Sequence, residues 1–91
     1  MEIKSVGVVG AGQMGNGIAH VMALSGFDVR LNDIDQGALD AAMDAIIRNL
    51  DRQVSREKIS VEDRDAALAR IVPTRDLAEV AQTNLVIEAA T

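Results

Sequence analysis

Five of the seven glycines in this 91-residue chain lie between Gly7 and Gly17. They do not form a flexible linker, because a valine-rich run over residues 3–9 surrounds the first of them. A short β-branched run that ends at a glycine is typical of a buried strand. Residues 10–15 then read Gly-Ala-Gly-Gln-Met-Gly, after which apolar side chains recur at helical spacing. The cluster therefore predicts a strand, a tight turn and a helix over residues 13–25.

Strands and helices alternate along the rest of the chain. Apolar and polar residues alternate over 27–33, which predicts a second strand. Beyond it, an apolar stripe predicts a long helix over 36–53, and a capping-box pattern at Ser60 predicts another helix, which Pro73 stops. The remaining predicted elements are a short strand from Ile71, a helix over 76–81 and a strand over 84–90.

This order of elements, β-α-β-α-α-β-α-β, is typical of parallel β-α-β units and predicts the α/β class. Residues 36–71 make an unusually long crossover between the second and third strands, which we interpret as a helical hairpin that stands away from the sheet. The Leu-Val-Ile run of the last strand is typical of a strand buried on both faces. No linker or internal repeat divides the chain.

The glycine turn matches the G-x-G-x-x-G pattern of dinucleotide-binding sites, and its context agrees with that function. The motif follows a strand, opens a helix and precedes an acidic residue at the end of the next strand. Gly10 permits the tight turn, Gly12 lets a diphosphate approach the backbone, and Gly15 lets the helix lie close to the strand. The free N–H groups of Gln13 and Met14 would point at the phosphates. The residues assigned to the cofactor here are Gly10, Ala11, Gly12, Gln13, Met14 and Gly15.

Asp33 is the acidic residue of the pattern, and it selects the cofactor. A carboxylate at the end of the second strand can accept hydrogen bonds from both hydroxyls of an adenosine ribose, whereas it would repel a 2′-phosphate. At about 4 Å and an effective dielectric constant near 20, that repulsion is roughly 4 kcal/mol per unit charge before screening. Residues 33–36 contain no arginine or lysine that could reverse it. The sequence therefore predicts NAD and not NADP.

Other interpretations of these residues stay open. The glycines could serve only tight packing, and Asp33 could be only a helix cap, although Asp35 suits that role better. A flavoprotein could hold FAD on a similar loop, although its early acidic residue is usually Glu. The methionines fit a role as core filler rather than as ligands; they are Met14, Met22 and Met43.

Composition argues against several other functions. Nine basic and fourteen acidic residues give a net charge of −5, which argues against a nucleic-acid surface and gives no support for binding an anionic membrane. The chain has no cysteine and one histidine, His20, so a thiolate or histidine-rich metal site is excluded. We place His20 on the helix surface without a chemical role. Because there is no long apolar run and no secretory signal pattern, we expect a cytoplasmic protein.

Residues 10–19, Gly-Ala-Gly-Gln-Met-Gly-Asn-Gly-Ile-Ala, resemble the helix opening of the 3-hydroxyacyl-CoA dehydrogenase family, especially its short bacterial 3-hydroxybutyryl-CoA members. The similarity continues through residues 58–60, 69–71, 74–77 and 85–90 and covers essentially the whole chain. The resemblance implies a partial Rossmann fold, with a four-stranded parallel sheet in the order 3-2-1-4 and the helical hairpin between strands 2 and 3.

The resemblance also implies an activity in fatty acid metabolism. Members of the family use NAD to oxidise the 3-hydroxy group of an acyl-CoA to a 3-keto group, or catalyse the reverse, and their helical hairpin helps to hold CoA. By position, Asn49 and Arg56 would match the family's CoA contacts, with Lys58 a neighbour, and a cation there suits the CoA phosphates. The resemblance places Ala89 and Ala90 beside the cofactor.

Family members are much longer than this chain, and their catalytic His and its partner Glu come later in the Rossmann domain. His20 lies on the wrong element to be that base, so we assign no catalytic residue. We therefore expect residues 1–91 to be a fragment, the N-terminal half of the NAD-binding domain, that binds NAD without catalysis. The helical domain that dimerises family members would be missing.

The exposed edge of the last strand predicts that the chain self-associates, through that edge or by exchange of elements. Two other functions stay open for the chain. One is a dehydrogenase of another 3-hydroxy acid, sugar acid or polyol, and the other is a dinucleotide-binding module without catalytic activity.

Overall fold

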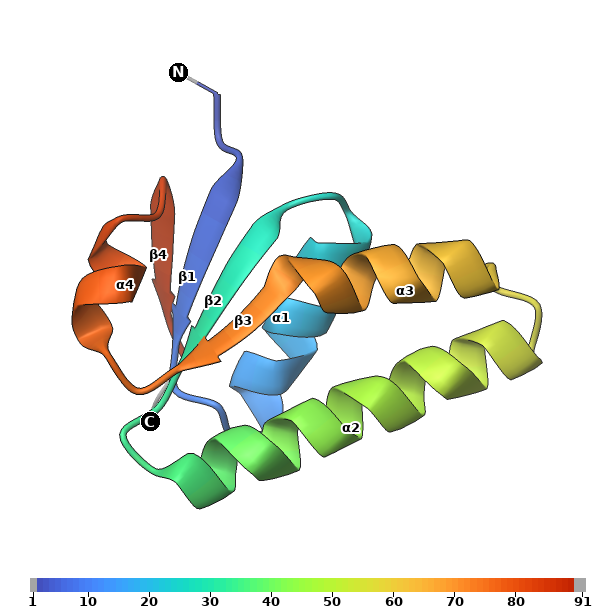
Figure 1. Ribbon diagram of the computed structural model, residues 1–91, viewed down its shortest axis with the longest axis horizontal. Helices are drawn as coiled ribbons and strands as arrows, with labels where there is room; N and C mark the ends of the chain where they lie inside the picture. The colour runs from blue at the N-terminus through green and yellow to red at the C-terminus, as the bar shows by residue number, and fades with distance from the viewer. Residues whose placement is uncertain (1, 90–91) are drawn as a thin grey trace.

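Figure 1 shows the computed structural model, which describes residues 2–89 of the chain. Within that range four strands and four helices alternate in the predicted order, and their boundaries lie close to the predicted ones. The elements in chain order are β1 (Ser5–Val9), α1 (Gln13–Leu24), β2 (Asp28–Asn32), α2 (Gln36–Ser55), α3 (Val61–Arg70), β3 (Ile71–Thr74), α4 (Leu77–Ala81) and β4 (Leu85–Glu88).

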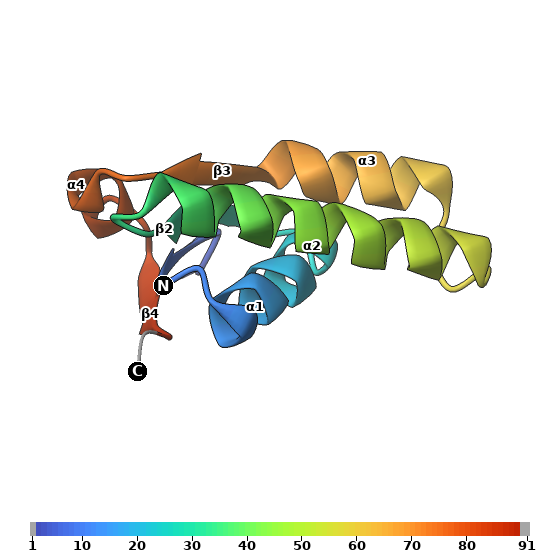
Figure 2. The same cartoon turned by 90° about the horizontal axis from the view of Figure 1, so that it is seen from below.

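The strands form one parallel sheet in the order β3-β2-β1-β4, which confirms the order that the family resemblance implies. In the register of the sheet, Val6 of β1 lies opposite Val29 of β2 and Leu85 of β4. Figure 2 shows α1 and α4 on opposite faces of the sheet. Since the strands are parallel, the turns that follow β1 and β2 lie at the same edge, where ligands of such sheets bind.

Small residues on α1 let this helix lie directly on the sheet. Gly15, Ala19 and Ala23 form its buried side, and they face the central strand, whose Val6 and Val8 are buried. The predicted apolar stripe of α2 is also confirmed, and it completes the core on this face. Of that stripe Leu39, Ile46 and Leu50 are fully buried, whereas Met43 and Val54 are half-buried; Ala42, which the prediction did not include, is buried beside them.

Two side chains of α1 lie elsewhere than predicted. Met14 is not core filler, because its side chain is 59% exposed. Its stripe is turned by about 100° from the stripe of small residues, and only the later members, Ile18 and Met22, pack partly against the core. His20 is not a free surface residue either. It is half-buried, and its Nε2 lies 2.7 Å from Oε1 of Gln53, so it contacts α2.

The predicted hairpin between β2 and β3 consists of α2 and α3. Asp35 caps α2 by accepting a hydrogen bond from the Gly37 N–H at 3.0 Å, and Ser60 and Asp63 form the predicted capping box of α3. The far end of the hairpin, with the turn between its helices, reaches beyond the sheet (Figure 1). Within residues 2–89 no helix, including the 20-residue α2, has the apolar stretch needed to cross a membrane.

Both edge strands differ in detail from the prediction. Pro73 does not stop α3, because the helix ends at Arg70 and the chain passes directly into β3, where Pro73 pairs with Leu31. A proline is tolerated in an edge strand, since its missing N–H can face away from the ladder. The Leu-Val-Ile run of β4 is not buried on both faces. Leu85 and Val86 are 40% and 49% exposed, because β4 is an edge of the sheet among the described residues.

Candidate cofactor-binding site

The turn between β1 and α1 needs a glycine at two positions for reasons within the chain. Gly10 has a φ of 101°, a backbone conformation that side chains disfavour, and its N–H donates to the carbonyl oxygen of Asn32 at 2.8 Å. At Gly15, an added Cβ would overlap the carbonyl oxygen of Gly10. These two glycines therefore make the turn tight and bring α1 onto the sheet.

Gly12 is different, because nothing in the chain requires a glycine there. Its φ of −67° suits any residue, and an added Cβ would meet no atom within 4 Å. The space in front of its backbone is therefore open to a group from outside the chain. Gly12 lies at the carboxyl edge of the sheet, between the end of β1 and the first turn of α1.

The first turn of α1 presents backbone N–H groups that no side chain caps. Gly12 occupies the N-cap position without a side-chain hydrogen bond, and the first turn contains no acidic residue. The other three helices of residues 2–89 are each capped by a side chain, of Asp35, Ser60 or Asp76. The exposed start of α1, at Gln13, therefore keeps the partial positive charge that attracts an anion.

Asp33 follows β2 and joins two loops at this edge. Its Oδ2 accepts a hydrogen bond from the Ala11 N–H at 3.0 Å, and its Oδ1 accepts one from the Asp35 N–H at 3.0 Å. These bonds, above all the one from Ala11, lower the pKa of the Asp33 carboxyl from its ordinary value of 3.8. The carboxylate is therefore fixed beside the glycine turn and ionised at neutral pH. Each oxygen keeps a lone pair for a further donor.

A set of contacts that the sequence did not predict holds the loop after β2. Asn32 is buried, and its Nδ2 donates to the carbonyl oxygen of Thr74 at 3.1 Å. The Asp33 N–H donates to the same oxygen at 3.3 Å. In addition, Nε of Arg75 donates to the carbonyl oxygen of Ile34 at 3.1 Å. The only signal in the sequence was Asn32 itself, a polar residue at the end of an apolar strand.

These loops surround a shallow pocket of about 210 Å³ at the ends of β1 and β2. The side chain of Ile34 is 82% exposed beside it, which is unusual for a large apolar residue and leaves an apolar surface next to Asp33. The residues that line the pocket are Val9, Gly10, Asn32, Asp33 and Ile34.

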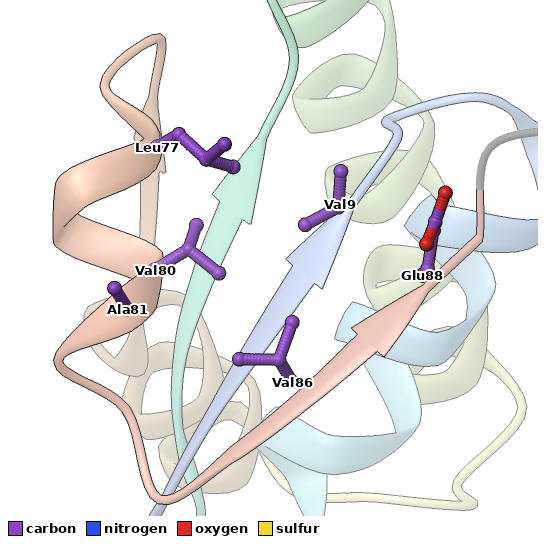
Figure 3. A pocket seen from close by; sticks show the side chains of 6 residues that line it. All are labelled: Val9, Leu77, Val80, Ala81, Val86 and Glu88. Atoms are coloured by element: carbon purple, nitrogen blue, oxygen red, sulfur yellow. The ribbon is translucent and has the colours of Figure 1, made fainter.

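A second, apolar groove of about 360 Å³ lies between α4 and the edge strand β4. Figure 3 shows Leu77 and Val80 of α4 on one side of it and Val86 of β4 on the other, with Val9 and Glu88 at the carboxyl ends of their strands. The groove therefore begins next to the glycine turn and continues along the open edge of the sheet.

The other predicted site residues lie in two places. Ala89 is beside the glycine turn, where its N–H donates to the carbonyl oxygen of Val9 at 2.8 Å; Ala90 lies outside the described residues. The predicted CoA contacts lie on the hairpin, whose end Figure 1 shows far from the glycine turn. All three are exposed: Asn49 within α2, Arg56 at its C-cap and Lys58 in the turn that follows. Among residues 2–89 no three His, Cys, Asp or Glu side chains cluster as a metal site would require.

Comparison with known proteins shows one family. Residues 5–91 match the family described as "3-hydroxyacyl-CoA dehydrogenase, NAD binding domain". A 3-hydroxybutyryl-CoA dehydrogenase of Bradyrhizobium diazoefficiens is 54% identical over 88 residues, which are 97% of this chain and 30% of that protein. A 3-hydroxybutyryl-CoA dehydrogenase of Mycobacterium tuberculosis is 42% identical over 96% of this chain and 30% of its own. The chain thus spans about 30% of the length of these relatives.

Solved structures show the same similarity. A 3-hydroxybutyryl-CoA dehydrogenase from Escherichia coli K12 superposes with a TM-score of 0.96 at 41% identity, over 100% of this chain and 19% of that one. An (S)-3-hydroxybutyryl-CoA dehydrogenase from Ralstonia eutropha gives a TM-score of 0.95 at 41% identity, over 99% of this chain and 32% of that one. The four strands, the hairpin and the glycine turn therefore occur together in longer enzymes.

Proposed function

The chain belongs to the NAD-binding domain family of 3-hydroxyacyl-CoA dehydrogenases, and from this premise we propose that its glycine turn and Asp33 hold NAD. The observation that carries the proposal is the open space at Gly12, because neither packing nor backbone conformation explains a glycine there. A diphosphate fits such a place, since it can approach a backbone that has no Cβ.

The diphosphate, the adenosine ribose and the adenine each have a complementary group in the chain. The uncapped N–H groups of Gln13 and Met14 donate to the diphosphate, and the helix dipole behind them adds about 1 kcal/mol. The free lone pairs of Asp33 accept from the two hydroxyls of the adenosine ribose. The exposed side chain of Ile34 supplies an apolar surface for the adenine. Ala89, whose N–H donates to the Val9 carbonyl oxygen, completes the site on the side of β4, and a role for Ala90 stays a prediction of the sequence.

NAD, when bound, supplies the hydride acceptor of the reaction, and these residues bind and orient it. The relatives' names support a parent protein that interconverts 3-hydroxyacyl-CoA and 3-ketoacyl-CoA. The chain alone binds NAD without catalysis, because it has no histidine that could act as the family's catalytic base. Its one histidine, His20, is hydrogen-bonded to Gln53 on the hairpin. A hydride-transfer assay with acetoacetyl-CoA and NADH tests both statements. The isolated chain should bind NADH and show no turnover, whereas the full-length parent should be active; turnover by the isolated chain would refute the second statement.

The acyl-CoA substrate is proposed to contact the end of the hairpin. Asn49, Arg56 and Lys58 are exposed there, and two cations suit the phosphates of CoA. In the parent protein, Arg56→Glu should raise the Michaelis constant for acyl-CoA and leave the affinity for NAD unchanged. An unchanged Michaelis constant would remove this assignment.

We further propose that the chain self-associates through the edge of β4. This edge leaves backbone N–H and C=O groups without a partner strand within residues 2–89, and the half-exposed Leu85 and Val86 lie on it. Such an edge is a template for pairing with a second copy. The cytoplasmic location and a dimeric parent stay predictions of the sequence.

A further inference from the structure

Arg75 brings a cation to the loop that the proposed function assigns to the adenosine ribose. Its side chain extends from the turn between β3 and α4, and its Nε donates to the carbonyl oxygen of Ile34 at 3.1 Å. Ile34 is the next residue after Asp33. The guanidinium is therefore held at the backbone of the residue that follows the carboxylate expected to select NAD. Residues 33–36 alone do not predict this cation, because Arg75 lies 41 positions from Ile34 in the sequence.

The Arg75 guanidinium keeps N–H donors that are free to bind a ligand. The bond to Ile34 uses one of its five N–H donors, the side chain is exposed, and the ion pairs found within residues 2–89 involve Arg64 and not Arg75. Asp33 in turn accepts from the N–H groups of Ala11 and Asp35. Arg75 is thus held at the backbone of Ile34, the residue after Asp33, and both the guanidinium and the carboxylate keep polar atoms for a ligand.

We propose that Arg75 is a specificity-determining residue of the cofactor site and provides a binding group for a 2′-phosphate. The inference rests on the proposed function, since it needs the ribose to lie at Asp33. Arginine is the side chain best suited to phosphate, because its N–H groups form paired, charge-assisted hydrogen bonds. Rejection of NADP then depends on the carboxylates of these loops, above all on Asp33, and Arg75 reduces the difference in affinity between the two cofactors.

Despite Arg75, the wild-type chain prefers NAD to NADP, because the loops after β2 and β3 carry more carboxylates than cations. Asp33 carries its charge at the proposed ribose site, and Asp35 and Asp76 are the N-caps of α2 and α4, which begin after the same two loops. A 2′-phosphate would meet more repulsion from these groups than attraction from Arg75. Removal of the Asp33 charge should reverse that balance, because the phosphate would then face the cation without the nearest anion.

The test is a titration of NADH and NADPH into four chains: wild type, Arg75→Ala, Asp33→Asn and the double variant. We expect Asp33→Asn to improve the affinity for NADPH relative to NADH by at least about tenfold. In that background, Arg75→Ala should weaken NADPH about tenfold and leave NADH within about twofold, as expected for loss of a charged hydrogen bond. Arg48→Ala, which removes an exposed cation from α2, should change neither affinity.

The outcomes separate this inference from the proposed function. The inference would be overturned if Asp33→Asn and the double variant bound NADPH with equal affinity. It would also be overturned if Arg75→Ala weakened the affinities for NADPH and NADH by the same factor. Failure of the wild-type chain to bind NADH would overturn the proposed function. If Asp33→Asn does not fold, the single variant Arg75→Ala still tests the inference against wild type. It should lower the affinity for NADPH and leave the affinity for NADH unchanged.

Discussion

At the scale of single residues, Gly15 and Gly17 of α1 differ in whether a side chain could replace their hydrogen. A methyl group at position 15 would overlap the Gly10 carbonyl oxygen, whereas one at position 17 would meet no atom within 4 Å. We expect Gly15→Ala to lower the free energy of unfolding by about 1–3 kcal/mol or more, through overpacking against rigid backbone.

The matched control is Gly17→Ala in the same helix. It should raise the free energy of unfolding by about 0.5–1 kcal/mol, because alanine loses less backbone entropy than glycine in a helix interior. Urea denaturation followed by circular dichroism measures both variants. Equal effects of the two substitutions would show that the close contact at Gly15 does not exist.

Asp33 makes stability depend on pH in a defined direction. Its pKa is lower in the folded chain than its ordinary value of 3.8, chiefly because of the Ala11 N–H. The stabilisation by the carboxylate is therefore complete above that value and is lost as the pH falls through the lower folded pKa. The stability advantage of wild type over Asp33→Asn should be constant from pH 5 to 7 and shrink below about pH 3.8. Asp44→Asn on the exposed side of α2 is the control, and an advantage that grows on acidification would contradict the assignment.

At the scale of elements, α1 and α2 end with the same hydrogen-bond pattern on different residues. After α1, Gly26 has a φ of 100° and the Phe27 N–H donates to the Met22 carbonyl. After α2, Glu57 has a φ of 60° and the Lys58 N–H donates to the Gln53 carbonyl. Both are Schellman caps, in which glycine is the usual residue at the left-handed position.

Glu57 therefore carries backbone strain that a glycine would relieve. We expect Glu57→Gly to raise the free energy of unfolding by about 0.5–1 kcal/mol, since the left-handed conformation costs more for a side chain than the entropy that glycine loses. Arg56→Gly, one residue earlier at a φ of −90°, should not stabilise the chain. Urea denaturation compares the two, and a stabilisation by Arg56→Gly as large as that by Glu57→Gly would contradict the explanation.

Local patterns in the sequence predicted most of these elements and part of the site. Periodicity and glycine spacing depend on neighbouring residues only, which is why the strands, the hairpin and the turn at Gly12 were found. The missed contacts join residues far apart in the sequence: Arg75 to Ile34, Asn32 to Thr74 and His20 to Gln53, which are 41, 42 and 33 positions apart. Such pairs depend on strand order and on helix rotation, and no local pattern encodes either.

At the scale of the whole molecule, the proposal that the chain self-associates through the open edge of β4 makes a prediction about its mass in solution. Sedimentation at tens of micromolar should show an average mass above the 9.7 kDa of one chain that rises with concentration. Val86→Lys should reduce the mass to that of a monomer, because a charge on an edge strand opposes pairing. Val72→Lys, at a similarly exposed position on the other edge, is the control and should leave association unchanged. A monomeric wild-type chain would contradict the proposal.

The most direct test of the cofactor site is the affinity for NADH of the wild-type chain and of Gly12→Ala, measured by titration calorimetry. No atom of the chain opposes a methyl group at position 12, so the variant should fold, with a free energy of unfolding within about 1 kcal/mol of wild type. We predict that the wild-type chain binds NADH and that Gly12→Ala binds it at least about tenfold more weakly, because the methyl group occupies the place of the diphosphate. Equal affinity of the two folded chains would contradict the assignment of this space to NAD.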